Sequence, residues 1–145
     1  MIKIRKLGHV VLRVRNLNRS THFYKDILGL NEVARYQDLM VFFAIDDTNH
    51  HDLAIMAVGD DAPKPSTNST GLYHIALKIG EDIDELRKAK QWLEKNKISI
   101  SGSADHTVSK SLYIADPDGN EIELYVDSPG WEKHREEISV KPLRI

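Results

Sequence analysis

Apolar and polar residues alternate between residues 105 and 127, where two short segments flank a turn. In residues 121–126, EIELYV, every second residue is aliphatic, and a period of two is typical of a strand with two different faces. The preceding residues 116–120, DPDGN, have the composition of a tight turn, because proline presets φ and glycine accepts a positive φ. We therefore predict a β-hairpin whose polar face carries Tyr113 and the mid-strand carboxylate of Glu123.

Two other strand patterns match each other position by position. Residues 8–14, GHVVLRV, and residues 73–79, YHIALKI, each place a histidine before aliphatic residues at every second position, and His74 follows His9 by 65 positions. Such self-similarity indicates two copies of one structural module. A single strand histidine is usually structural, and a single half-polar strand is typical of a sheet with one solvent-exposed face. Two histidines related by a repeat, together with Glu123, instead indicate metal ligands.

The hydrophobic periods predict the order β-α-β-β-β in both copies. In the first copy the predicted strands are residues 3–14, 30–36, 39–45 and 51–58, and the helix is 19–28, with Asn18 as N-cap and Gly29 after its end. In the second copy the first strand begins at residue 72, the helix is 83–96, and the later strands are 99–104, 111–115 and 121–126. The fold class predicted is therefore α+β, with the aliphatic strand faces covered by helices.

The length of 145 residues favours a single domain. Its predicted segments are module 1 at about 1–58, a polar linker at 59–71, module 2 at about 72–127 and a tail at 128–145. The tail has no clear period, and we predict a short helix around residues 131–138 within it.

Charge and composition narrow the class of protein. A net charge of −2 gives no electrostatic basis for binding nucleic acid or an acidic membrane. No apolar run reaches the ~18 residues that span a bilayer, and the apolar part of the N-terminus is too short for a signal peptide. The absence of cysteine excludes disulfides and thiolate ligands and fits a cytoplasmic protein.

Four motifs together resemble the vicinal oxygen chelate superfamily, which includes glyoxalase I, extradiol dioxygenases, fosfomycin-modifying transferases and bleomycin-binding proteins. They are GHVVLRV at 8–14, FYKDILGL at 23–30, YHIALKI at 73–79 and DPDGNEIELY at 116–125. The resemblance implies two β-α-β-β-β modules that form an open, cup-shaped mixed sheet with flanking helices around a divalent metal. It also implies that His9, His74 and Glu123 bind this metal.

Finer motifs resemble the catalytic half of the type I extradiol dioxygenases, which open catechol rings. HDLAIM, from His51, is similar to a strand whose histidine is the acid–base residue, with the neighbouring His50 as the alternative for this role. DHTVSKSLYIADP, from residue 105, is similar to the substrate-site segment. This resemblance implies that His106 and Tyr113 hydrogen-bond the substrate and oxygen. It implies a role in aromatic compound catabolism, with a small aromatic substrate and O2. Most such enzymes have two of these domains, so we expect a homodimer or the C-terminal tail to complete the site.

The ligand types agree with this chemistry. Two histidines and one carboxylate on one face of a metal leave three adjacent positions open, as in the non-haem Fe(II) oxygenases. A catechol can occupy two of these positions and O2 the third, while a nearby histidine accepts a proton. We therefore expect Fe(II), with Mn(II), Zn(II) or Ni(II) as alternatives.

Two other functions stay open at the level of sequence. A glyoxalase-like lyase or isomerase would resemble this chain but would need a fourth protein ligand near Ala54, which cannot bind metal, although Asp52 lies on the same strand face. A binding protein that sequesters a drug or another small molecule is the second alternative, and such proteins often lack the three ligands.

Overall fold

The computed structural model describes residues 1–145 and contains two compact units, Met1–Pro65 and Ser66–Ile145. The division falls inside the predicted linker at 59–71, which forms no helix or strand. Each unit contains one copy of the repeat and is described by itself. No helix of either unit has the length and apolar character needed to cross a membrane.

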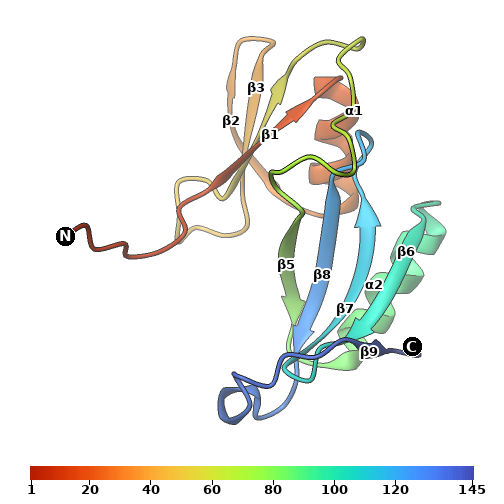
Figure 1. The fold of residues 1–145 in the computed structure, drawn as a ribbon. Coiled ribbons are helices and arrows are strands. Elements are labelled where there is room, and N and C mark those ends of the chain that lie inside the picture. Colours follow the sequence, from red (N-terminus) through yellow and green to blue (C-terminus); the bar gives the residue numbers. More distant parts are fainter. The chain divides into compact units, whose positions relative to one another are not determined.

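The first unit has a four-stranded mixed sheet (Figure 1). Its elements are β1 (Val10–Val14), α1 (Leu17–His22), the π-helical turn η1 (Phe23–Ile27), β2 (Asn31–Tyr36), β3 (Met40–Ala44) and β4 (Leu53–Ala57). The strand order is β1-β4-β3-β2, and only the β1–β4 pair is parallel.

The second unit repeats this order with one added strand. Its elements are β5 (His74–Gly80), α2 (Ile83–Lys95), β6 (Ile100–Asp105), β7 (Ser109–Ala115), β8 (Glu121–Asp127), the 3₁₀ turn η2 (Trp131–Lys133) and β9 (Lys141–Pro142). The strand order is β5-β8-β7-β6-β9, and β5 pairs with β8 in parallel. The matching topology of the two units confirms the repeat and the α+β class with two β-α-β-β-β modules and open mixed sheets. The shared cup and the single domain stay predictions.

The aliphatic strand faces form the two cores, as their alternation predicts. In the first unit, the buried side chains come from β1, β3, β4 and η1: Leu12, Val14, Tyr24, Val41, Phe43, Leu53 and Ile55. In the second unit, α2 contributes Leu86 and Leu93 against the strand residues Leu112, Ile114, Ile122, Leu124 and Val126. Burial of one face leaves the opposite, mostly polar face of the second sheet available for a site.

The ends of the helices agree only in part with the sequence predictions. The N-cap of α1 is Asn16, not Asn18, because Asn16 has extended backbone angles and its side chain accepts a hydrogen bond from the Arg19 amide at 3.0 Å. Gly29 ends the following turn with φ of +77°, as predicted. The helix α2 begins with a capping box that the sequence analysis did not identify, formed by Asp82 and Glu85.

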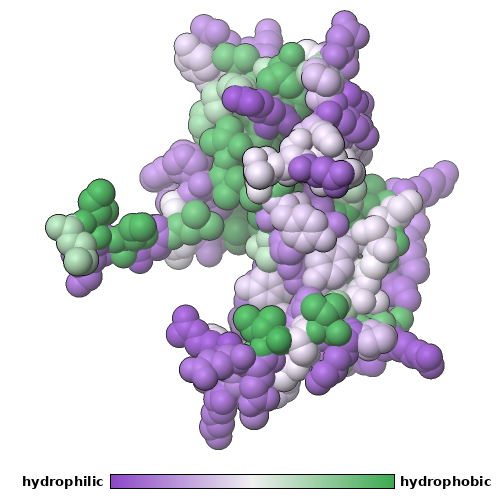
Figure 2. Space-filling view, in the orientation of Figure 1, coloured by the Kyte–Doolittle hydropathy of each residue, from purple (hydrophilic) through white to green (hydrophobic).

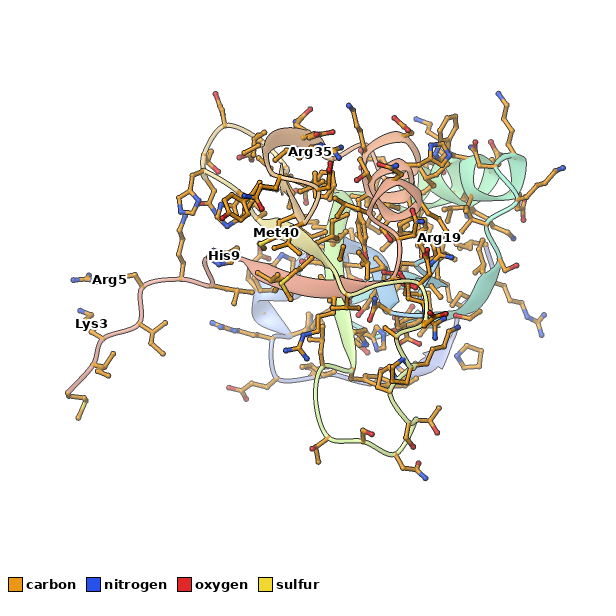
Figure 3. The ribbon with its side chains drawn as sticks, turned by 90° about the horizontal axis from the view of Figure 1, so that it is seen from above. Lys3, Arg5, His9, Arg19, Arg35 and Met40 are labelled. Carbon is orange, nitrogen blue, oxygen red and sulfur yellow. The ribbon has the colours of Figure 1, made fainter.

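The two ends of the chain correct the predicted elements. The first strand begins at Val10 rather than residue 3, because its partner β4 begins only at Leu53. The residues before β1 extend away from the sheet, with Lys3 and Arg5 projecting from this arm (Figures 1 and 3). Apolar residues of the arm are exposed in the space-filling view (Figure 2). At the other end, the predicted helix around 131–138 is only the turn η2, and the tail continues into β9, which pairs with β6.

Candidate functional site

The polar face of the second sheet brings four of the predicted site residues together. Tyr113 of β7 lies directly opposite Glu123 of β8, and His74 of β5 lies opposite Glu121, two residues before Glu123 on the same face. His106 follows the end of β6 and reaches the same group through its ring. The alternation of the hairpin thus positions these side chains, because residues two apart share a face of a strand.

His74 and Glu123 are adjacent and have the donor atoms of a metal site. The Nε2 atom of His74 lies 3.1 Å from Oε2 of Glu123. Its Nδ1 atom lies 3.3 Å from Oε1 of Glu121, but the angle gives no hydrogen bond, and Nδ1 is buried without a hydrogen-bond partner. A buried polar atom without a partner is uncommon and calls for a ligand or a functional explanation. The atom that faces the buried carboxylate of Glu123 is Nε2, and this imidazole–carboxylate pair fits part of a divalent metal site.

Glu123 is held by a residue that the sequence analysis did not identify. The buried hydroxyl of Ser111 donates a short hydrogen bond to Oε1 of Glu123, which is itself only 8% exposed. A buried carboxylate is costly unless hydrogen bonds or a cation compensate for its lost hydration. The alternation that placed Tyr113 on this face also predicts Ser111 two residues earlier, so this position could have been found from the sequence.

His106 and Tyr113 form a hydrogen-bonded pair next to Glu123. The Nε2 atom of His106 lies 2.6 Å from the Tyr113 hydroxyl and 3.7 Å from Oε1 of Glu123. Burial, and then the negative charge of Glu123, raise the pKa of Tyr113 to about 12. The Tyr113 hydroxyl therefore keeps its proton at neutral pH and can act as a hydrogen-bond donor.

His9 and His51 lie together in the first unit, beside His50. The ring centroids of His9 and His51 are 4.3 Å apart, and the Nδ1 atoms of His50 and His51 are 2.6 Å apart. Figure 3 shows His9 where the N-terminal arm meets β1. Burial, followed by the charges of His9 and His50, lowers the pKa of His51, so its ring is neutral and can accept a proton at neutral pH.

Neither Ala54 nor Asp52, the two strand positions considered for a fourth metal ligand, has a donor atom that is available in this unit. Ala54 is fully buried and offers no donor atom. The carboxylate of Asp52 accepts hydrogen bonds from the Ile45 amide at 2.8 Å and from the Asn49 side chain at 3.0 Å. These bonds hold the loop between β3 and β4 and lower the pKa of Asp52. Metal binding by Asp52 would require that they be broken.

The six predicted site residues thus form two groups, one in each unit. His74, Glu123, His106 and Tyr113 are gathered in the second unit, and His9 and His51 in the first. No three histidine, aspartate or glutamate side chains converge on one metal position in the structure. The complete ligand set of His9, His74 and Glu123 therefore remains a proposal.

Residues 6–124 match the model of the "Glyoxalase/Bleomycin resistance protein/Dioxygenase superfamily". The chain belongs to this superfamily. The solved structures include a similar glyoxalase/dioxygenase from Nostoc punctiforme, 25% identical with a TM-score of 0.73, in which the match covers 86% of this chain and 92% of that one. The present chain therefore has the same fold as the Nostoc punctiforme protein.

Two curated relatives bear the names of two different activities. The chain is 35% identical to the catechol-2,3-dioxygenase of Bacillus subtilis (strain 168), over 90% of this chain but only 45% of that protein. It is 30% identical to the metallothiol transferase FosB of Staphylococcus epidermidis (strain ATCC 12228 / FDA PCI 1200), over 86% of this chain and 83% of that protein. The chain spans less than half the length of the dioxygenase.

Proposed function

We propose that this superfamily member is a metal-dependent extradiol-type dioxygenase that opens the ring of a catechol-like aromatic diol with O2. The observation that carries the proposal is the His106–Tyr113 hydrogen bond beside the His74–Glu123 pair on one sheet face. Hydrogen-bonding groups next to metal-binding groups suit a substrate that carries two adjacent hydroxyls. The catechol-2,3-dioxygenase relative supports the same substrate class.

In this proposal, His9, His74 and Glu123 bind one divalent metal. Two imidazoles and a carboxylate without cysteine suit Fe(II) first, and Mn(II), Zn(II) or Ni(II) as alternatives. Bound iron would supply the redox chemistry between the aromatic ring and O2. The chain itself contributes the orientation of these ligands, and Ser111 fixes the carboxylate of Glu123 by its hydrogen bond.

The remaining residues handle protons and hydrogen bonds. His51 has a lowered pKa and accepts a proton from a catechol hydroxyl. Tyr113 is protonated and His106 lies within hydrogen-bonding distance of it, so the pair orients an oxygen atom of the substrate. In this proposal, His51 is the acid–base residue, and His106 and Tyr113 orient the substrate.

A transferase or glyoxalase-like reaction is the second candidate. It is favoured by the metallothiol transferase FosB, because the chain covers most of that protein but less than half of the dioxygenase. The occupied carboxylate of Asp52 and the buried Ala54 disfavour the four-ligand glyoxalase form. A binding protein for a small molecule is a third candidate, and the presence of all three ligand-type side chains disfavours it.

We also propose that the chain is cytoplasmic and works as a homodimer, because it matches only 45% of the length of the dioxygenase relative and a second subunit can complete the site. Light scattering at micromolar concentration tests this assembly. A monomer that still turns over a catechol would end the dimer proposal.

The deciding experiment measures oxygen consumption. Protein purified without oxygen is loaded with Fe(II), its metal content is determined, and a panel of catechols is added in an oxygen electrode. We expect catechol-dependent O2 uptake with a yellow ring-opened product. Iron-loaded protein that consumes no O2 with any catechol, but joins a thiol to an electrophilic small molecule, would move the assignment to the transferase.

A further inference from the structure

The C-terminal segment contacts His106 through its residue Ser139. The Ser139 carbonyl oxygen lies 2.8 Å from Nδ1 of His106, and the Ser139 amide donates to the His106 carbonyl at 3.2 Å. The hydroxyls of Ser139 and Thr107 are 2.8 Å apart. Three contacts from one tail residue converge on two adjacent residues of the site segment.

The chemistry of these groups determines which ring nitrogen carries the proton. A carbonyl oxygen can only accept, so Nδ1 of His106 must be the N–H donor in this hydrogen bond. In a neutral imidazole, Nε2 then has no proton and must accept from the Tyr113 hydroxyl, 2.6 Å away. The tail thus specifies this tautomer, and the Tyr113 hydroxyl, which can either donate or accept, is compatible with it.

Without the tail, the opposite tautomer would be competitive. The carboxylate of Glu123 lies 3.7 Å from Nε2, and a negative charge at this distance favours an N–H on the nitrogen that faces it. An N–H at Nε2 could also donate to the Tyr113 oxygen and would reverse the direction of that hydrogen bond. The Ser139 carbonyl accepts from Nδ1, so it is the group that opposes this change.

We propose that the C-terminal segment is a positioning element, in which the Ser139 carbonyl keeps His106 in the Nδ1–H form with Nε2 as an acceptor toward Tyr113. Two contacts hold the C-terminal segment against β6. Lys141 of β9 pairs with Asp105 of β6, and the Ser103 hydroxyl donates a hydrogen bond to the Leu143 carbonyl at 2.9 Å. Because β6 ends immediately before His106, pairing of β9 with β6 holds Ser139 in register with the ring.

The consequence for catalysis rests on the proposed dioxygenase function. With Nε2 unprotonated, the Tyr113 hydroxyl directs its proton to His106, and the Tyr113 oxygen acts as an acceptor toward a substrate hydroxyl. With the other tautomer, His106 would occupy that oxygen instead. A tail that fixes the ring therefore changes how the site receives a diol, although no tail residue needs to touch the substrate.

The test reads the tautomer in the intact, metal-free protein by ¹H–¹⁵N NMR of labelled histidines, with the His106 signals assigned by their loss in His106→Gln. We expect Nδ1 to give the signal of a protonated ring nitrogen and Nε2 that of an unprotonated one. A protonated Nε2 with a bare Nδ1 at neutral pH would overturn the proposal. This measurement needs neither metal nor substrate, so it can fail while the dioxygenase proposal stands.

Two variants connect the tautomer to the tail. Ser139→Pro removes the amide that donates to His106 and should displace the carbonyl, so a population with protonated Nε2 should appear. Ser139→Ala is the matched control, because it removes only the hydroxyl contact with Thr107 and should keep the wild-type tautomer. A folded Ser139→Pro protein with an unchanged tautomer contradicts the role of Ser139. If that variant does not fold, the wild-type spectrum alone decides.

Discussion

The Nε2 atom of His74 lies 3.1 Å from Oε2 of Glu123, although the two residues come from different strands. The parallel pairing of β5 and β8 places Ala76, not His74, directly opposite Glu123. The contact is therefore diagonal across the sheet, beside the small side chain of Ala76. A histidine and a glutamate at this distance can bind one cation without a change of register.

The first prediction concerns metal binding by His74. His74→Ala should abolish stoichiometric binding of Fe(II) and keep the far-UV circular dichroism of the wild type, because β5 is held by its aliphatic face. Metal analysis after anaerobic dialysis measures the change. The control is His134→Ala, which replaces an exposed histidine of the same unit whose side chain contacts Glu137. Full metal occupancy in His74→Ala would remove His74 from the ligand set.

The second prediction concerns the hydroxyl that orients Glu123. Ser111→Ala removes the hydrogen bond to Oε1 and should weaken metal affinity by about 10–100-fold, the usual effect of losing a group that orients a ligand. Competition with a metal-binding dye measures the affinity. Ser101→Ala is a suitable control, because Ser101 is exposed and donates to the Tyr113 carbonyl on a neighbouring strand. Equal affinities for both variants and wild type would show that Glu123 does not need Ser111.

The sequence predicts much of the second sheet because its signals are local. The turn at residues 116–120 forms as expected: the Asp116 carboxylate accepts from the Asn120 amide, and Gly119 has φ of +89°. Alternation also predicts correctly that Ile122 is buried while Glu123 faces Tyr113. Turn chemistry and a period of two each depend on a few neighbouring residues, so one chain is enough to recognise them.

The parts that the sequence does not predict depend on distant partners. The start of β1 at Val10 is set by where β4 begins, and nothing in the alternating arm before it marks this limit. The pairing of β9 with β6 involves only two residues of the tail, and one of them is Pro142. The contact of His106 with Ser139 is made by the backbone carbonyl of Ser139. Every residue has such a carbonyl, so the residue type at position 139 does not predict the contact.

The third prediction concerns the capping box of α2. The Glu85 carboxylate accepts from the amides of Glu81 at 2.6 Å and Asp82 at 3.2 Å, and a methyl group at Gly80 would overlap it. Gly80→Ala should therefore displace Glu85 and lower the free energy of unfolding by about 1 kcal/mol, the typical net contribution of one intramolecular hydrogen bond. Urea unfolding measures this value. Gly8→Ala, where a methyl group meets no atom, provides the matched control.

A double-mutant cycle tests the mechanism of this effect. In a Glu85→Ala background, the carboxylate that the new methyl group would displace is absent, so Gly80→Ala should cost much less. If Gly80→Ala destabilises both backgrounds equally, the loss comes from the strand backbone and not from the cap.

The fourth prediction concerns pH and Asp52. Hydrogen bonds from the Ile45 amide and the Asn49 side chain hold the pKa of Asp52 below its usual range. A lowered folded-state pKa stabilises the protein above the unfolded-state value of about 3.9, and this contribution is lost as pH falls through the folded-state value. Asp52→Asn should therefore be less stable than wild type at pH 7, and the difference should shrink below about pH 4.

Urea unfolding of both proteins between pH 7 and pH 3 measures this dependence. Asp47→Asn, an exposed change in the same loop, controls for the lost negative charge. A difference between wild type and Asp52→Asn that is constant over this pH range would contradict the assigned role of the carboxylate.

The last prediction concerns His51, which distinguishes the dioxygenase from its alternatives. Its ring centroid lies 5.2 Å from Phe42 and 4.3 Å from His9, so His51→Phe can keep these ring contacts while removing the proton acceptor. We expect iron-loaded His51→Phe to retain its metal and its catechol affinity, and to lose ring cleavage by about 10²–10⁴-fold, the usual contribution of a general acid–base residue. O2 uptake, the yellow product and metal content are measured in the same sample.

The neighbouring histidine supplies the control, because the Nδ1 atoms of His50 and His51 are 2.6 Å apart. His50→Phe should keep most of the activity. Because burial and the nearby histidines lower the pKa of His51, turnover of the wild type should fall on acidification only below pH ~6.5, the unperturbed value for histidine. Loss of activity in His50→Phe but not in His51→Phe would assign the proton to His50. Unchanged turnover in both variants would exclude both histidines from the chemistry and leave ring cleavage to the groups of the second sheet. Iron-loaded wild type without any catechol-dependent O2 uptake would instead favour the thiol-transfer reaction.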